Sequence, residues 1–186
     1  MNCIYIMDEK NYLEAFEKRV KEALLLPFPE MGGRFLETED VMEQWERLKQ
    51  EYVADAIMQI TDYPEVSVAW AAYLGMAIAE LWDRGDEEYK QVCYTDFYGS
   101  QGFDDMDDYI VTHYLRYSLE SDEAREYTKI YQMCGRIATN CIRREQIPPQ
   151  SPLAYHCFIV VCRLMFTLGA SLRLKHLGYA LHRVDL

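Results

Sequence analysis

The sequence has only four histidines, and its six cysteines form no Cys-x-x-Cys pair. Zinc-finger sites and thioredoxin-type redox motifs are therefore excluded. Glycine-rich phosphate-binding loops, the His-Glu-x-x-His zinc motif, the Gly-x-Ser-x-Gly nucleophile motif and the His-x-Glu pair of nucleobase deaminases are also absent. No histidine has a glutamate three positions before it, which excludes the Glu-x-x-His pattern of di-iron helical bundles. Most enzyme classes that have a short sequence signature are thus excluded as functions of this protein.

The formal net charge of −12 is unevenly distributed along the chain. Residues 1–130 carry 12 Lys and Arg against 29 Asp and Glu, whereas residues 131–186 carry 7 against 2. The simplest explanation is that basic C-terminal helices pack against acidic ones. The alternative is a basic face for an anionic ligand, made by Arg136, Arg143, Arg144, Arg173 and Lys175. The acidic total disfavours nucleic acid as a partner.

The cysteines and the N-terminal residues bear on the cellular compartment. Cys134, Cys141, Cys157 and Cys162 lie at apolar positions of helical patterns and are predicted to be small buried hydrophobic residues. The first residues, Met-Asn-Cys-Ile-Tyr-Ile-Met, lack the basic start and long apolar run of a secretory signal. Because disulfides need an oxidising compartment, we expect a reduced, cytoplasmic protein.

Helix start and stop signals recur along the chain, and no period-two strand pattern bounded by hairpin turns is present. A length of 186 residues suits one domain. The sequence predicts an all-α fold, a single-domain antiparallel helical bundle of about six or seven helices covering residues 1–186. The predicted helices cover residues 8–26, 38–60, 64–84, 86–94, 104–117, 121–146 and 152–175.

The helix at 152–175 is predicted to be the enclosed, central one. Ser151 is a favourable N-cap, Pro152 fits the first helical position, and apolar side chains then occupy nearly every side of the helix. A membrane-spanning helix has a similar length, but Arg163 near the middle disfavours insertion. We therefore expect no membrane association, and a carboxylate partner for Arg163.

The helix at 64–84 is predicted to be a second enclosed helix. Its middle, from Val66 to Ala79, is apolar on nearly every side and rich in alanine, with a glycine at Gly75. Small residues such as alanine and glycine let neighbouring helices approach closely, so this helix is predicted to be enclosed by others.

One acidic motif lies at the start of the helix predicted from residue 104. Asp104-Asp105-x-x-Asp108 resembles in form the magnesium-binding Asp-Asp-x-x-Asp motif of isoprenoid synthases, which are also all-α enzymes. The preferred interpretation is that these acids face water and complement the helix N-terminus.

A second acidic pattern combines two helices. Glu43-x-x-Glu46 lies early in one helix and Glu80-x-x-Asp83 late in the next. If these helices form a hairpin that turns near Asp62, the four carboxylates converge into an oxygen-rich site of the kind that binds Mg²⁺. The pattern is similar to the paired acidic motifs of all-α nucleoside triphosphate pyrophosphohydrolases, which implies a magnesium-dependent hydrolase. Alternatively, Glu43 and Glu46 face solvent, and one of the acids pairs with Arg47 or Arg84.

The leading functional hypothesis is a protein-interaction or self-associating module without catalysis or cofactor. Its partner is another protein or a second copy of the chain. The 15 tyrosines exceed what a core of this size requires, and tyrosine is favoured at interfaces. Tyr94, Phe97, Tyr98 and Phe103 are the predicted surface aromatics. The alternative is a magnesium-dependent hydrolase of a phosphate-containing substrate, with metal ligands Glu43, Glu46, Glu80 and Asp83.

Overall fold

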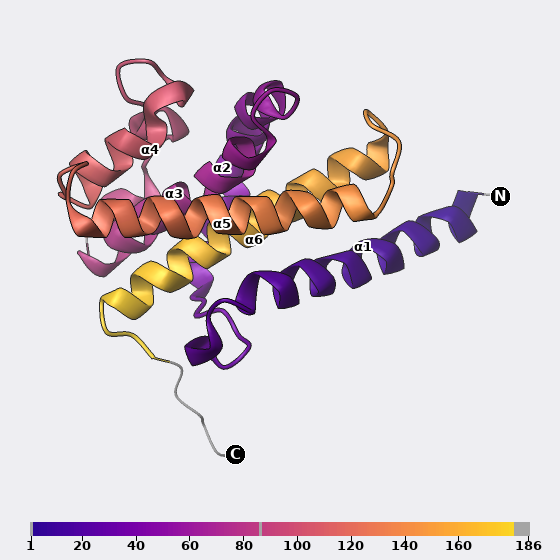
Figure 1. Ribbon diagram of the computed structural model, residues 1–186, viewed down its shortest axis with the longest axis horizontal. Helices are drawn as coiled ribbons and strands as arrows, with labels where there is room; N and C mark the ends of the chain where they lie inside the picture. The colour runs from indigo at the N-terminus through magenta and orange to yellow at the C-terminus, as the bar shows by residue number, and fades with distance from the viewer. Residues whose placement is uncertain (1, 86, 181–186) are drawn as a thin grey trace.

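The computed structural model describes residues 2–85 and 87–180, and within these ranges the chain forms six α-helices and no β-strand (Figure 1). The predicted all-α bundle is confirmed. Four 3-10 turns and one π turn, Ile110–Tyr114, connect or extend the helices. The α-helices are α1 (Asn2–Leu25), α2 (Glu39–Gln59), α3 (Pro64–Asp83), α4 (Met106–Tyr109), α5 (Asp122–Arg144) and α6 (Pro152–His176).

The helix starts follow from local side-chain chemistry. The hydroxyls of Thr38, Ser121 and Ser151 each accept a hydrogen bond from the backbone N–H three residues later, at 3.1 to 3.3 Å. These bonds satisfy N–H groups that have no partner within the helix. A proline opens both α3 and α6, where its missing N–H has no effect on the helix. The predicted caps of α2, α5 and α6 are confirmed.

Helices α3 and α6 form the centre of the bundle and share its most extensive contact. In Figure 1, α6 runs diagonally behind α5, and α1 lies along the lower side of both. Two glycines set how closely α3 and α6 approach. A Cβ atom added at Gly169 would lie 1.9 Å from the carbonyl oxygen of Ala72, and one added at Gly75 would lie 2.0 Å from that of Phe166. Both predictions, an enclosed α6 and a small-residue α3 in close contact, are confirmed.

Helices α2 and α3 form the predicted antiparallel hairpin. The Trp82 indole N–H donates to the carboxylate of Asp40 at 3.2 Å, and the Tyr52 hydroxyl donates to the carbonyl of Ser67 at 2.7 Å. The two helices therefore run side by side in opposite directions, with contacts near the turn and at their far ends.

The segment between α3 and α5 packs as a second, aromatic layer of the core. Tyr94, Phe97 and Phe103 are buried, and the rings of Tyr94 and Phe103 pack against the buried ring of Tyr52. Tyr98 is half-buried and donates its hydroxyl proton to Asp55. The predicted aromatic surface is therefore wrong, because burial of these rings in the core removes their apolar surface from water.

The same segment contains less α-helix than predicted. The helix predicted at 86–94 is reduced to a 3-10 turn at Glu87–Lys90, and the one predicted from residue 104 is divided between a 3-10 turn, α4 and the π turn. Segments this short gain few intrahelical hydrogen bonds, so tertiary packing decides their conformation.

Among the described residues, α6 is the one helix long and apolar enough to cross a membrane, and 78% of its most apolar stretch is buried inside the bundle. Arg163 forms a salt bridge with Glu17 of α1 at 2.6 Å, so the predicted carboxylate partner is confirmed. A core helix surrounded by other helices has this composition.

Candidate functional site

The four predicted metal ligands lie on a correctly predicted hairpin but do not come together. Glu43 and Glu46 are exposed on α2, and Glu46 pairs with Lys49. Glu80 is buried, with 8% of its surface exposed, and it faces α6. The described residues contain no group of three or more His, Cys, Asp or Glu side chains placed to hold a metal ion. The rotation of α3 about its axis, which the hairpin register does not determine, turns Glu80 away from α2.

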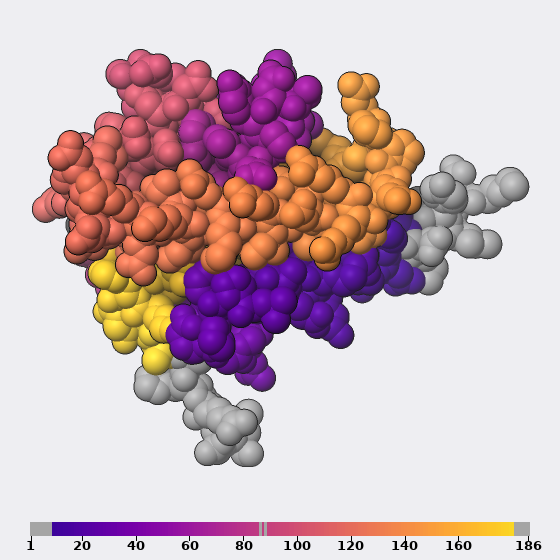
Figure 2. Space-filling model, viewed as in Figure 1, coloured from indigo at the N-terminus to yellow at the C-terminus, as the bar shows by residue number. Residues whose placement is uncertain are grey.

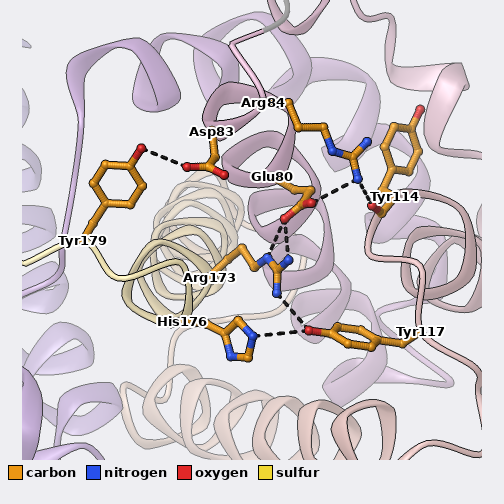
Figure 3. Close-up of polar contacts among 8 residues, drawn as sticks. All are labelled: Glu80, Asp83, Arg84, Tyr114, Tyr117, Arg173, His176 and Tyr179. Carbon is orange, nitrogen blue, oxygen red and sulfur yellow. Dashed lines mark hydrogen bonds and ion pairs between the residues drawn. The ribbon is translucent and has the colours of Figure 1, made fainter.

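Glu80 is the centre of a buried charge network that links α3, α6 and the segment before α5 (Figure 3). Arg173 donates from Nε to Glu80 Oε2 at 2.7 Å, and Arg84 donates from Nη2 to Glu80 Oε1 at 3.0 Å. Arg173 also donates to the Tyr117 hydroxyl at 3.2 Å, and Arg84 to the carbonyl of Tyr114. Two guanidinium groups thus compensate one buried carboxylate.

These contacts keep the Arg173 guanidinium ionised. Burial alone lowers the pKa of the Arg173 guanidinium, but its hydrogen bonds to Tyr117 and Glu80 outweigh this effect and raise the pKa above its ordinary value. Arg173 is 6% exposed, so nearly all of its charge is compensated by the protein. The network explains how a buried charge is tolerated between α3 and α6, and it leaves no carboxylate oxygen of Glu80 without a cation.

The remaining acids of both predicted motifs also have structural partners or face solvent. Asp83 accepts a hydrogen bond from the Tyr179 hydroxyl at 2.9 Å. Asp105 accepts from the backbone N–H of Gln101 and the hydroxyl of Ser100, each at 3.1 Å, and so closes the loop before it. Asp104 and Asp108 are exposed.

The basic residues of the C-terminal part are mostly paired with acids. Arg173 pairs with Glu80, Arg136 with Glu65 at 3.5 Å, and Lys175 with Glu30 at 3.2 Å. Arg143 and Arg144 lie in the last turn of α5, where a positive charge complements the helix dipole. The charge asymmetry of the sequence therefore reflects, in large part, internal pairing.

One concavity in the described part of the chain is an apolar groove of about 730 Å³. It lies between the end of α2, the end of α5 and the start of α6, and the notch beside the α5–α6 loop is visible in Figure 2. The apolar groove is lined by Ile57, Ile60, Thr61, Ile142, Arg143, Gln146, Ile147, Pro149, Gln150, Ser151, Pro152, Ala154, Tyr155 and Phe158.

A second concavity, which we call the Asp107 cleft, has a volume of about 380 Å³ and lies between α3, α4 and α5. Burial raises the pKa of the Asp107 carboxyl to about 6, and the charge of Asp108 adds to this rise, whereas the backbone N–H of Asp108 opposes it. A perturbed carboxyl group in a cleft is a feature of many functional sites. The cleft is lined by Glu65, Val66, Ala69, Trp70, Tyr73, Asp107, Thr128, Tyr131, Gln132 and Arg136.

The raised pKa of Asp107 predicts a specific pH dependence of stability. The folded protein keeps the Asp107 proton up to about pH 6, whereas an unfolded aspartate loses it near its ordinary pKa of 3.8. Between these values the folded state binds more protons, so the free energy of unfolding falls as the pH rises. Because Asp107 is half-buried, we expect Asp107→Asn to add about 1 to 2 kcal/mol at pH 7 and almost nothing at pH 4.

Thermal unfolding of the wild type and Asp107→Asn between pH 4 and pH 8 measures this effect. The control is the exposed Asp104, whose charge does not contribute to the raised pKa of Asp107, so Asp104→Asn should change the pH profile far less. A variant Asp107→Asn that is less stable than the wild type at pH 7 would contradict the prediction.

The sequence contained a signal for Asp107 that motif matching missed. The matched acids were Asp104, Asp105 and Asp108, yet Asp107 precedes Ile110, Val111 and Tyr114 by three, four and seven positions. That spacing places Asp107 on the apolar side of a helix, and those three residues are buried. The inward position of Arg173 was also missed, although it follows Phe166 and Gly169 on the same helical face.

Comparison with known proteins finds no match: no protein family model, no curated protein and no solved structure is significantly similar to this chain.

Proposed function

We propose that this protein is a non-enzymatic interaction module that binds a segment of another protein in the apolar groove. The observation that carries the proposal is the groove itself, a concavity of about 730 Å³ with an apolar lining. Ile57 is 36% exposed and Tyr155 is 43% exposed, although the chain buries many other large apolar side chains. Apolar surface left open in a rimmed concavity is typical of sites that bind peptides or other ligands.

The composition of the lining favours an amphipathic helix as the bound segment. Apolar residues come from the ends of two helices and the start of a third, as in grooves that receive one apolar helix face. Arg143 is the one charged residue in the lining, and no carboxylate lines it. Arg144 lies next to it and is also exposed. A partner helix with an acidic residue beside its apolar face would therefore complement the groove, although the whole chain is acidic.

Site-specific photo-crosslinking tests this proposal. A p-benzoylphenylalanine in place of Tyr155 reports on the groove, and one in place of Met58 is the matched control. Met58 is 77% exposed on α2 and adjacent to Ile57, but it does not line the groove. We expect an adduct with one partner protein from position 155 and not from position 58.

The captured protein is then purified, and its affinity is measured for the wild type, Tyr155→Glu and Met58→Glu. Loss of a central aromatic contact should weaken binding by about tenfold or more, which corresponds to about 1.4 kcal/mol, whereas Met58→Glu should have little effect. Equal affinities for the two variants would contradict the proposal. Crosslinks between two copies, with a dimer in sedimentation experiments, would identify a second copy of the chain as the occupant instead.

A further inference from the structure

The Asp107 cleft is separate from the apolar groove and has a different chemistry. The two share no lining residue. Five of the ten residues that line the cleft lie along one side of α3, four lie on α5, and α4 contributes Asp107. The groove is almost uncharged, whereas the cleft contains charged side chains of both signs.

The charges of the cleft do not balance. Arg136 forms a salt bridge with Glu65 at 3.5 Å, which pairs the one cation of the lining with one of its two carboxylates. Asp107 has no salt bridge to any described residue, and the exposed carboxylate of Asp108 is adjacent in sequence. A half-enclosed cavity with an excess carboxylate attracts a positively charged group more strongly than an exposed carboxylate does, because less water screens the interaction.

Aromatic rings make up much of the remaining lining. Trp70, Tyr73 and Tyr131 line the cleft, and the rings of Tyr73 and Tyr131 pack edge to face with centroids 4.9 Å apart. Packing against Phe103, at a centroid distance of 4.7 Å, holds the Trp70 ring in place. Aromatic surface beside a carboxylate is the combination that binds organic ammonium ions. The hydroxyl of Thr128 and the amide of Gln132 add hydrogen-bond acceptors.

A metal ion fits this cleft poorly. Calcium takes six or more oxygen ligands, and magnesium needs nearly octahedral coordination. Among the described residues no three acidic, histidine or cysteine side chains are grouped for such a role. An organic ammonium ion needs only one carboxylate and an apolar surface around it. The chemistry of the lining therefore favours an organic ammonium ion over a metal ion.

We propose that the Asp107 cleft binds a small organic ammonium ion, with the Asp107 carboxylate as its counter-ion, the Trp70 ring against its alkyl groups, and the nearly buried rings of Tyr73 and Tyr131 beneath it. The volume of about 380 Å³ is at the small end of the range for ligand pockets, which suits a compact amine. Glu65 and Arg136 flank the bound ion and are neutral as a pair.

Isothermal titration calorimetry at low ionic strength and pH 7.5 tests the proposal. The cationic probe is choline, and the neutral control is 3,3-dimethyl-1-butanol, which has nearly the same shape without the charge. We expect choline to bind at least tenfold more tightly than the alcohol. Amide chemical-shift changes should map to residues 65–73, 107 and 128–136. Equal binding of the two compounds, no binding of choline up to 10 mM, or shifts confined to another region would overturn the proposal.

Variants test which side chains recognise the positive charge of choline. Asp107→Asn should weaken choline binding at least tenfold, and it is expected to be more stable than the wild type, so the loss would not reflect unfolding. The exposed residue Gln132 offers a matched pair: Gln132→Glu adds a carboxylate and should tighten binding several-fold, whereas Gln132→Lys should weaken it. Unchanged affinity in both Asp107→Asn and the Gln132 pair would also overturn the assignment.

Discussion

Replacing Gly169 with alanine is expected to lower the free energy of unfolding by about 3 kcal/mol or more. Alanine normally stabilises a helix by up to about 1 kcal/mol relative to glycine. Here the sign reverses, because the added Cβ would lie 1.9 Å from the backbone oxygen of Ala72 and 2.6 Å from its carbonyl carbon. Backbone atoms of a packed helix cannot rotate away, so α3 and α6 would have to separate along their whole contact.

Urea denaturation followed by circular dichroism measures this loss. Gly32→Ala is a suitable control, because Gly32 has a φ of +60° and no atom within 4 Å of the added Cβ. The free energy of unfolding of that variant should fall by only about 1 to 2 kcal/mol, because alanine is strained in the left-handed conformation. A Gly169→Ala protein as stable as the wild type would show that α3 and α6 do not approach as closely as described.

Removing the carboxylate at the centre of the charge network is the second change with a large expected effect. Glu80→Gln leaves the Arg173 guanidinium buried without a counter-charge, and breaking a buried ion pair in this way typically removes about 3 to 5 kcal/mol. Arg173→Met should be less damaging, because Arg84 still donates to Glu80 at 3.0 Å. The expected order of stability is therefore wild type, then Arg173→Met, then Glu80→Gln.

A double-mutant cycle measures the interaction energy between Glu80 and Arg173 separately from their other contacts. Glu80→Gln combined with Arg173→Met removes both charges, so the double variant should be more stable than Glu80→Gln alone. The measurement is again the denaturant midpoint. Additive losses in the double variant would show that Glu80 and Arg173 are not coupled, contrary to the 2.7 Å hydrogen bond between them.

The candidate sites were only partly visible in the sequence. The sequence predicted the hairpin of α2 and α3 and a pairing of one acid with Arg47 or Arg84, and the structure contains the hairpin and a Glu80–Arg84 ion pair. The same spacing predicted that four carboxylates converge, whereas in the structure Glu80 faces α6. No local pattern identified the apolar groove, because its walls come from two segments, residues 57–61 and 142–158, that are far apart in the chain.

The sequence alone determined where the long helices α2, α3, α5 and α6 begin and end, and that α3 and α6 are enclosed. Caps such as Thr38 and Ser151, the prolines that open α3 and α6, and the apolar or small residues on all sides of those two helices act within a few residues, so they can be read locally. The tertiary structure decided which charges and rings are buried: Arg173 instead of Arg163, the aromatic segment before α5, and Asp107 instead of its acidic neighbours. The physical reason is that the rotation and crossing of packed helices depend on close contacts between distant segments, such as Gly169 with Ala72, and helical periodicity does not encode these contacts.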